Sequence, residues 1–169
     1  MTTADLTLVS RLRAADERQR LLQVIQPALI GLIDGTISTL APIFATAYIA
    51  GSHAALLVGL AAALGAAISR GMSEGLSDDG QITGRGAAFS RGMITGVATF
   101  VGGTAHALPF LINDIDTALT VAYVVVSIEL VLIAWVRKRF LGVPLKTSLI
   151  QVTLGGIIVA TVGVLVGHA

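Results

Sequence analysis

Long apolar runs alternate with short polar breaks along most of the chain. A helix needs about 20 apolar residues to cross the hydrocarbon of a bilayer. Five runs have roughly that length, and they are Ile25–Ala50, Ala54–Ser73, Gly92–Ile112, Thr117–Trp135 and Thr147–Val166. The pattern therefore predicts an all-α, polytopic membrane protein with five transmembrane helices.

The breaks between the runs have the composition of turns and loops. Gly51-Ser52-His53 follows the first run, Asn113–Asp116 follows the third, and Gly142-Val143-Pro144 introduces the last. The longest internal connection, 76–91, contains three glycines that mark a flexible loop. Residues 1–20 are polar and rich in arginine, unlike a signal peptide. We expect a polar cytoplasmic segment, 1–20, and one transmembrane domain, 21–169.

The basic residues all fall on one side of this topology. The 11 lysines and arginines are Arg11, Arg13, Arg18, Arg20, Arg70, Arg85, Arg91, Arg137, Lys138, Arg139 and Lys146. Cytoplasmic loops carry an excess of Lys and Arg. This predicts a cytoplasmic N-terminus, an external C-terminus and a place in a membrane such as the bacterial inner membrane.

Composition agrees with a membrane protein and removes several other classes. The chain is 54% hydrophobic and 12% charged, whereas a soluble domain has about 25% charged residues. The absence of cysteine excludes disulfides and thiolate metal sites, and no basic cluster suggests a nucleic-acid partner.

Small residues recur every fourth position along the second run in two rows, which favours close helix packing. The rows are Gly59, Ala63, Ala67, Gly71, Gly75 and Ala61, Gly65, Ser69, Ser73, Ser77. We expect this helix to be central, with neighbours on two sides.

Three carboxylates on three predicted helices occupy the cytoplasmic half of the membrane, where ionisable groups are costly and are candidates for function. At a rise of about 1.5 Å per residue, Asp34 lies roughly 10 Å from the cytoplasmic face and Glu129 about 12 Å from it. Glu74 lies at the cytoplasmic mouth, and Arg70 is one turn deeper, near the depth of Asp34. His106 falls in the outer half, about 21 Å beyond Gly92.

Asp34 has the most suggestive surroundings, because Ser38 follows one turn later and Gly35 loosens the helix. Carboxylate and hydroxyl oxygens are ligands for hard or borderline divalent cations. A buried carboxylate can also take up a proton, and a group that holds either ion is the minimal part of an antiporter. The alternative is an Asp34–Arg70 pair that only holds helices together.

The other charged candidates each leave two interpretations open. Glu74 shares a helical stripe with Arg70 and Asp78, either as surface ion pairs or as a vestibule that attracts cations. Glu129 is a secondary metal candidate or makes a structural bond between helices. His106 is a structural residue, a metal ligand or a proton relay.

Several motifs together resemble the vacuolar iron transporter family. They are "DGTISTLAP", "LVGLAAALGAAIS…SEGLSDDG", "SDDGQITGRG", "GGTAHALPF", "VVVSIEL" and "QVTLGGIIVATVG", and they cover about residues 22 to 167. The membrane domain of the bacterial erythrin-type members, or membrane-bound ferritins, is the more similar subgroup. The resemblance implies a homodimer of five-helix subunits that exports ferrous iron, or another divalent ion such as manganese, in exchange for protons. It makes Asp34 and Glu74 the pathway carboxylates and implies no tightly bound cofactor.

Two departures from the family pattern affect this interpretation. Arg70 stands where the family has a methionine before the glutamate, and Met72 lies about 200° away around a helix. The ferritin-like domain that precedes the membrane part in erythrin-type members is replaced by residues 1–20, which suggests a separate ferritin-like partner. The leading hypothesis is a proton-coupled divalent metal transporter. The alternative is a non-transporting scaffold or regulator whose pathway is blocked by Arg70. The sequence motifs of intramembrane proteases do not occur, so we do not expect an enzyme.

Overall fold

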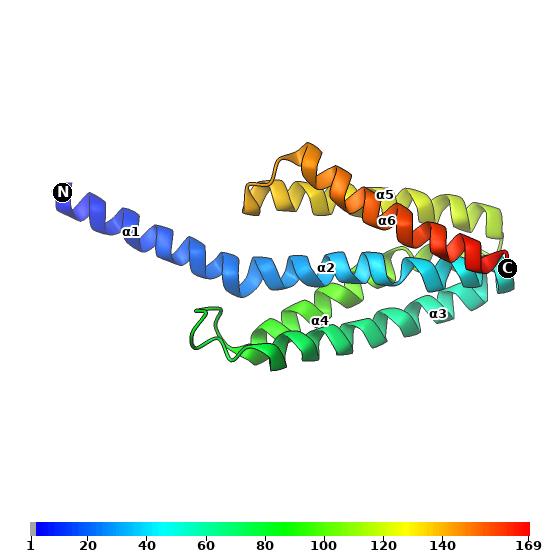
Figure 1. Ribbon diagram of the computed structural model, residues 1–169, viewed down its shortest axis with the longest axis horizontal. Coiled ribbons are helices and arrows are strands. Elements are labelled where there is room, and N and C mark those ends of the chain that lie inside the picture. Colours follow the sequence, from blue (N-terminus) through cyan, green and yellow to red (C-terminus); the bar gives the residue numbers. More distant parts are fainter. Residues whose placement is uncertain (1–2) are drawn as a thin grey trace.

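The computed structural model describes the backbone of residues 3–169 and the side chains of residues 12–169. All its regular elements over this range are helical, which confirms the all-α prediction for the described residues (Figure 1). In chain order they are α1 (Thr3–Arg20), the π-helix η1 (Leu21–Ile25), α2 (Gln26–Ser38), α3 (Leu40–Ser77), α4 (Ala88–Ala105), the 3₁₀-helix η2 (Leu108–Leu111), α5 (Ile115–Leu141) and α6 (Leu145–Gly167).

The segment α1 extends beyond the rest of the molecule (Figure 1). Its side chains from residue 12 to residue 20 are all exposed. The chain continues from α1 through the π-turn of η1 into α2 without leaving helical geometry. Pro27, which has no amide hydrogen, follows directly after this π-turn, at the point where the regular helical hydrogen bonding is already interrupted. Three polar or charged regions lie at the margin of the bundle (Figure 1): α1, the loop after α3, and the connection between α5 and α6.

The first predicted span is interrupted twice. Helix α2 ends at Ser38, and Thr39 (φ −92°, ψ −12°) separates it from α3. Within α3 the backbone leaves helical geometry at Gly51 (φ 78°, ψ −174°), where the predicted turn reverses the chain so that Ile43 packs against Gly59. A positive φ of this kind strains any residue with a Cβ, so the reversal depends on glycine.

Helix α4 packs between α2 and the second half of α3 through small residues on both sides. On the α2 side, a methyl group on Gly31 or Gly35 would collide with the carbonyl oxygens of Thr95 and Thr99. On the α3 side, a methyl group on Gly71 would lie 2.9 Å from the carbonyl oxygen of Gly92. The backbones thus touch directly, as in close packing of membrane helices.

The two predicted rows of small residues have different surroundings. The row from Gly59 to Gly75 faces α4, whereas the row from Ala61 to Ser77 is exposed in this subunit. The expectation that the second span is the central helix is therefore wrong within the subunit. The central position belongs to α4, because α4 presents glycines and carbonyl groups to both neighbours.

Among the residues that the structure describes, three helical segments are long and apolar enough to cross a membrane, namely Leu12–Ser77, Ile115–Leu141 and Leu145–Gly167. The first of them reverses at Gly51. The predicted third span is not a continuous helix over residues 92–112, because α4 ends at Ala105 and the short 3₁₀-helix η2, which contains Pro109, follows it. Pro109 and Phe110 are buried, so this irregular backbone lies against protein, as polar main chain in an apolar bundle must.

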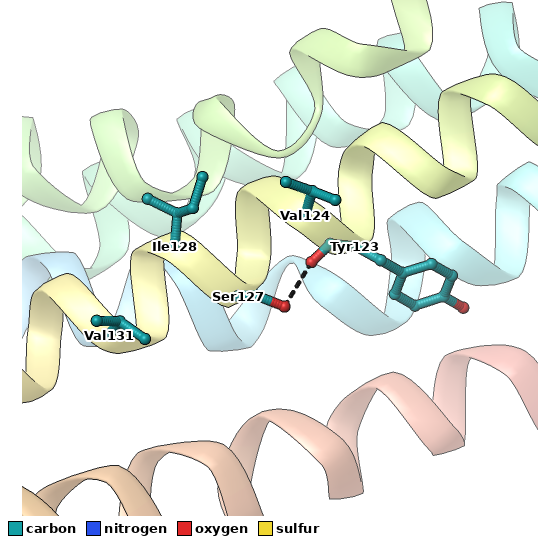
Figure 2. A pocket seen from close by; sticks show the side chains of 5 residues that line it. All are labelled: Tyr123, Val124, Ser127, Ile128 and Val131. Carbon is teal, nitrogen blue, oxygen red and sulfur yellow. Dashed lines mark hydrogen bonds between the residues drawn. The ribbon is translucent and has the colours of Figure 1, made fainter.

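The outward face of α5 is apolar, and Figure 2 shows it at close range. Tyr123, Val124, Ile128 and Val131 surround a shallow hollow of about 430 Å³. The one serine on this face, Ser127, donates its hydroxyl hydrogen to the carbonyl oxygen of Tyr123 at 2.8 Å (Figure 2). Its polar group is thus satisfied by its own helix, which is how a serine is accommodated on an apolar surface.

Candidate functional site

The candidate residues lie in three separate places. The first, which we call the exposed pair, is Asp34 with Arg70. The second is the loop network, which consists of Glu74, Asp78, Arg85 and Arg91. The third is the buried triad, which consists of Thr39, His106 and Glu129. Metal-ligand candidates that the sequence suggested for one pathway are therefore divided among three environments.

The exposed pair joins α2 to α3. The Nε atom of Arg70 lies 3.9 Å from Oδ1 of Asp34, and the side chains keep 44% and 32% of their surfaces exposed. Their contact places Arg70 and Asp34 at the same level along the bundle. At 3.9 Å the two charges attract without a hydrogen bond, and the Asp34 carboxylate stays accessible. Ser38, one turn further on, is also exposed.

Met72 lies on a different surface from Asp34. Together with glycines from both helices and Phe100, it lines an apolar groove of about 800 Å³ between α3 and α4. Its side chain is 57% exposed there. The thioether is therefore directed away from the exposed pair, in keeping with its position two residues after Arg70 on the helix.

In the loop network, Glu74 is paired with two guanidinium groups. Its Oε1 lies 2.6 Å from Nη2 of Arg85 and 3.1 Å from Nε of Arg91. The stripe expected from the sequence, in which Arg70 would pair with Glu74 and Asp78, does not form. The physical reason is that α3 ends at Ser77 and the following loop carries Arg85 back over the helix end, while Arg70 faces α2.

Arg91 is fully buried at the start of α4, which is unusual for so strong a charge. It donates hydrogen bonds to the carbonyl oxygens of Asp78, Arg85 and Gly86 in addition to its bond with Glu74. A buried charge is tolerated when its partners are complete, and here the loop backbone supplies them. The loop from 78 to 87 is thereby folded around one side chain.

Asp78 fixes the first half of this loop. Its carboxylate accepts hydrogen bonds from the hydroxyl of Thr83 at 2.7 Å and from the amide of Gly80 at 2.8 Å. These bonds, the Thr83 bond first, lower the pKa of Asp78 from its ordinary value of 3.8, and the charges of Arg91 and Arg85 act in the same direction. Gly80 has φ 80° and lies against the carbonyl of Gly86, so the loop closes only with glycine at this position.

The buried triad connects α2, α4 and α5 through hydrogen bonds whose directions can be deduced. Thr39 donates its hydroxyl hydrogen to the carbonyl oxygen of Gly35 at 2.8 Å. Because that hydrogen is used, the Thr39 oxygen accepts from Nε2–H of His106, also at 2.8 Å. The other ring nitrogen, Nδ1, lies 2.9 Å from Oε2 of Glu129. Both ring nitrogens are therefore engaged within the protein.

The contact of His106 with Glu129 differs from their sequence-based depths, which put them in opposite halves of the membrane. Helix α4 ends at Ala105, so His106 sits at its C-terminus where the chain turns inward toward buried Pro109. Helix α5 continues past Arg137 to Leu141, so Glu129 lies deeper than a count from Arg137 suggests. The two shifts bring the side chains to one level.

Several buried polar residues lie along α4 between the loop network and the buried triad. Arg91, Thr95, Thr99 and His106 are all completely buried, and Thr36 of α2 lies beside Gly102 between the last two. The hydroxyls of Thr36 and Thr95 have no hydrogen-bond partner among the residues whose side chains are described. We call Thr95, Thr99 and Thr36 the threonine file.

Sequence reasoning did not find Arg85, Arg91, Thr39 or the threonine file. A signal for the file was present, because hydroxyl residues follow Arg91 at four-residue spacing and place one polar stripe on a helix in an apolar region.

Compared with models of protein families, with curated proteins and with solved structures, the chain has no match in any of the three. The chemistry of these clusters therefore rests on the residues themselves, and the family resemblance stays an interpretation of short motifs.

Proposed function

We propose that this protein is a proton-coupled transporter that moves divalent metal ions, ferrous iron or manganese, out of the cytoplasm. The observation that carries the proposal is Asp34, a carboxylate that is 32% exposed within an apolar membrane-spanning segment. Such a group needs water, a cation or a partner around it. Its oxygens suit divalent cations, and its one ion pair, with Arg70, is long enough to be exchanged.

The proposed topology has five crossings with the N-terminus in the cytoplasm. The crossings are α2 with the first part of α3, the second part of α3, α4, α5 and α6. Support comes from Figure 1, where α1, the loop after α3 and the α5–α6 connection lie at the same end of the molecule. All the lysines and arginines except Arg70 lie in these regions or in the adjoining ends of α4, α5 and α6, as expected for a cytoplasmic end.

A homodimer would cover the exposed charges of the subunit. Asp34, Arg70 and the outer row of small residues from Ala61 to Ser77 are exposed on α2 and α3. Charges exposed to lipid are costly, and small residues allow a second helix to approach closely. In this arrangement the metal path follows the surface between two subunits, with Asp34 and Glu74 as its carboxylates, and a separate ferritin-like protein can supply the metal.

Metal flux into proteoliposomes tests this function. A pH gradient should drive Fe²⁺ or Mn²⁺ movement in the wild type, and Asp34→Asn should reduce the initial rate about tenfold or more, which corresponds to about 1.4 kcal/mol. Asp116→Asn is the matched control, because Asp116 is exposed in the first turn of α5. No metal movement in the wild type, or equal rates in the Asp34→Asn variant and the control, would contradict the proposal.

A second candidate function is favoured by the arginines that pair with both carboxylates. Arg70 faces Asp34, and Arg85 and Arg91 hold Glu74. This is the geometry expected of a scaffold or regulator of the same family with a blocked pathway. It predicts a silent wild type in which Arg70→Met creates flux. An active wild type whose rate is unchanged or lowered by Arg70→Met excludes it.

A further inference from the structure

The metal path proposed above uses Asp34 and Glu74 and leaves the buried triad without a role. We propose that His106 and Glu129 form the proton-binding site of the bundle and hold one exchangeable proton between them. This inference deepens the proposed function and rests on it only for the coupling to metal.

The hydrogen-bond directions show that a proton lies between the two side chains. Because His106 donates from Nε2 to Thr39, its Nδ1 atom either donates to a Glu129 carboxylate or accepts from a Glu129 carboxylic acid. One proton occupies the 2.9 Å gap in both cases. Without it, two lone pairs would face each other in a region where both side chains are at most 10% exposed.

The proton also decides the net charge of the pair. With it the pair is neutral, either as imidazolium and carboxylate or as imidazole and carboxylic acid. Without it the pair carries one negative charge in the core, which is costly unless another charge compensates. A divalent cation near Asp34 would supply this compensation. Asp34 precedes Thr39 by five positions, about 7.5 Å along a helix.

No other titratable group contacts the pair among the described side chains. On α2, Asp34 faces Arg70; on α3, Tyr48 bonds to Tyr123 of α5 at 3.3 Å. His53 is exposed at the turn after Gly51, and α4 has Arg91 as its only charged residue, about 22 Å away along the helix. The segments 108–111 and 147–166 contain no ionisable residue. Among the described side chains, the pair thus has no ionisable neighbour in this part of the core.

The threonine file lies between this site and the loop network. The fully buried hydroxyls of Thr36 and Thr95 lack partners among the described side chains, and Thr99 donates to the carbonyl oxygen of Thr95 at 2.9 Å. The three hydroxyls are therefore not bonded to one another, and the file is not a continuous chain of hydrogen bonds. The proton site thus consists of His106 and Glu129, with Thr39 as the acceptor on the far side of the ring.

The first experiment observes the proton directly and needs no transport. Replacing His53 and His168, the only other histidines, by glutamine leaves His106 as the sole source of imidazole signals in ¹⁵N-histidine NMR spectra of the full chain in lipid. Between about pH 5 and about pH 9, the Nδ1 signal should report loss of one proton per subunit, and Glu129→Gln should move this change. A pH-independent Nδ1 signal, or the same titration in the Glu129→Gln protein, overturns the proposal.

The second experiment separates this inference from the proposed function. In proteoliposomes, His106→Gln should still carry Mn²⁺ down its own gradient, but a pH gradient should no longer drive accumulation against it. The matched control is His53→Gln, an identical substitution at an exposed histidine, which should retain the driven accumulation. Driven accumulation at the wild-type level in a monodisperse His106→Gln protein refutes the proton site alone. A silent wild type refutes the proposed function and leaves the NMR result to decide the proton site.

Discussion

At the scale of single residues, Arg91 organises the loop between α3 and α4. Its guanidinium is fully buried and bonds to Glu74 and to three loop carbonyls. Removing one member of a buried, hydrogen-bonded ion pair leaves the other charge unpaired, which costs more than the pair itself contributes. The loop therefore depends on this side chain more than on its own sequence.

Arg91→Met should lower the free energy of unfolding by about 3 to 5 kcal/mol. The comparison is Arg137→Met, because Arg137 makes an exposed hydrogen bond to Gln151, and surface changes usually stay within about 0.5 kcal/mol. Denaturant unfolding in detergent, followed by circular dichroism, measures both. Equal losses in the two variants would show that Arg91 is not the anchor of the loop.

Asp78 makes the stability of the same loop depend on pH. Folding lowers the pKa of Asp78 from 3.8, so the ionised carboxylate stabilises the fold above that value. This contribution disappears as the pH falls through the lower folded pKa. The midpoint of thermal unfolding should differ between wild type and Asp78→Asn by a constant amount from about pH 5 to about pH 7, and the difference should shrink below about pH 3. A difference that widens in acid contradicts this assignment; Asp116→Asn gives the background effect of losing an exposed carboxylate.

Sequence reasoning predicted some of these residues and missed others for a physical reason. Asp34 and Arg70 could be matched because both lie on regular helix, where depth follows from counting. The partners of Glu74 could not, because Arg85 and Arg91 reach it through a loop whose path depends on hydrogen bonds to backbone carbonyls. His106 and Glu129 were each recognised as candidates, but their contact depends on where α4 ends.

At the scale of elements, the seam between α2 and α4 is the closest helix-to-helix approach made by the described glycines. Glycines at 31 and 35 lie directly on the carbonyl groups of Thr95 and Thr99. The apolar pattern predicted the helices and most of the loops, including the turn at Gly51. It did not reveal the break at Thr39 or the early end of α4, because hydropathy does not change at either point. For the end of α4, Pro109 was the available signal in the sequence.

Gly35→Ala should force α2 away from α4 and cost about 1 to 3 kcal/mol of stability, as overpacking in a core does. Gly155→Ala is the matched control, because Gly155 is helical in α6 and a methyl group there would lie 3.6 Å from Cδ1 of Ile37, an ordinary van der Waals contact. At such a helical site the same change is neutral or stabilising by up to about 1 kcal/mol. Unfolding of the two variants in detergent decides the matter. A Gly35→Ala protein as stable as the Gly155→Ala protein would mean that the seam is looser than described.

At the scale of the whole molecule, the lack of native cysteine makes the topology directly measurable. Single cysteines at Asp16 and Asp79 should react with a membrane-impermeant maleimide only from the cytoplasmic side, in inverted vesicles. Cysteines at His53 and Asn113 should react only from the outside, in intact cells. All four positions are exposed. If Asp79→Cys and Asn113→Cys react from the same side, α4 does not cross and the five-crossing topology is wrong.

The central position of α4 also has a mechanical consequence. One end of this helix holds Arg91, which binds the loop, and its other end holds His106, which reaches α5. Its contacts with α2 and α3 are made largely by glycines, backbone carbonyls and small side chains. An axial displacement of this helix would therefore change the bonding of Arg91 and of His106 together, although the two residues lie about 22 Å apart along the helix.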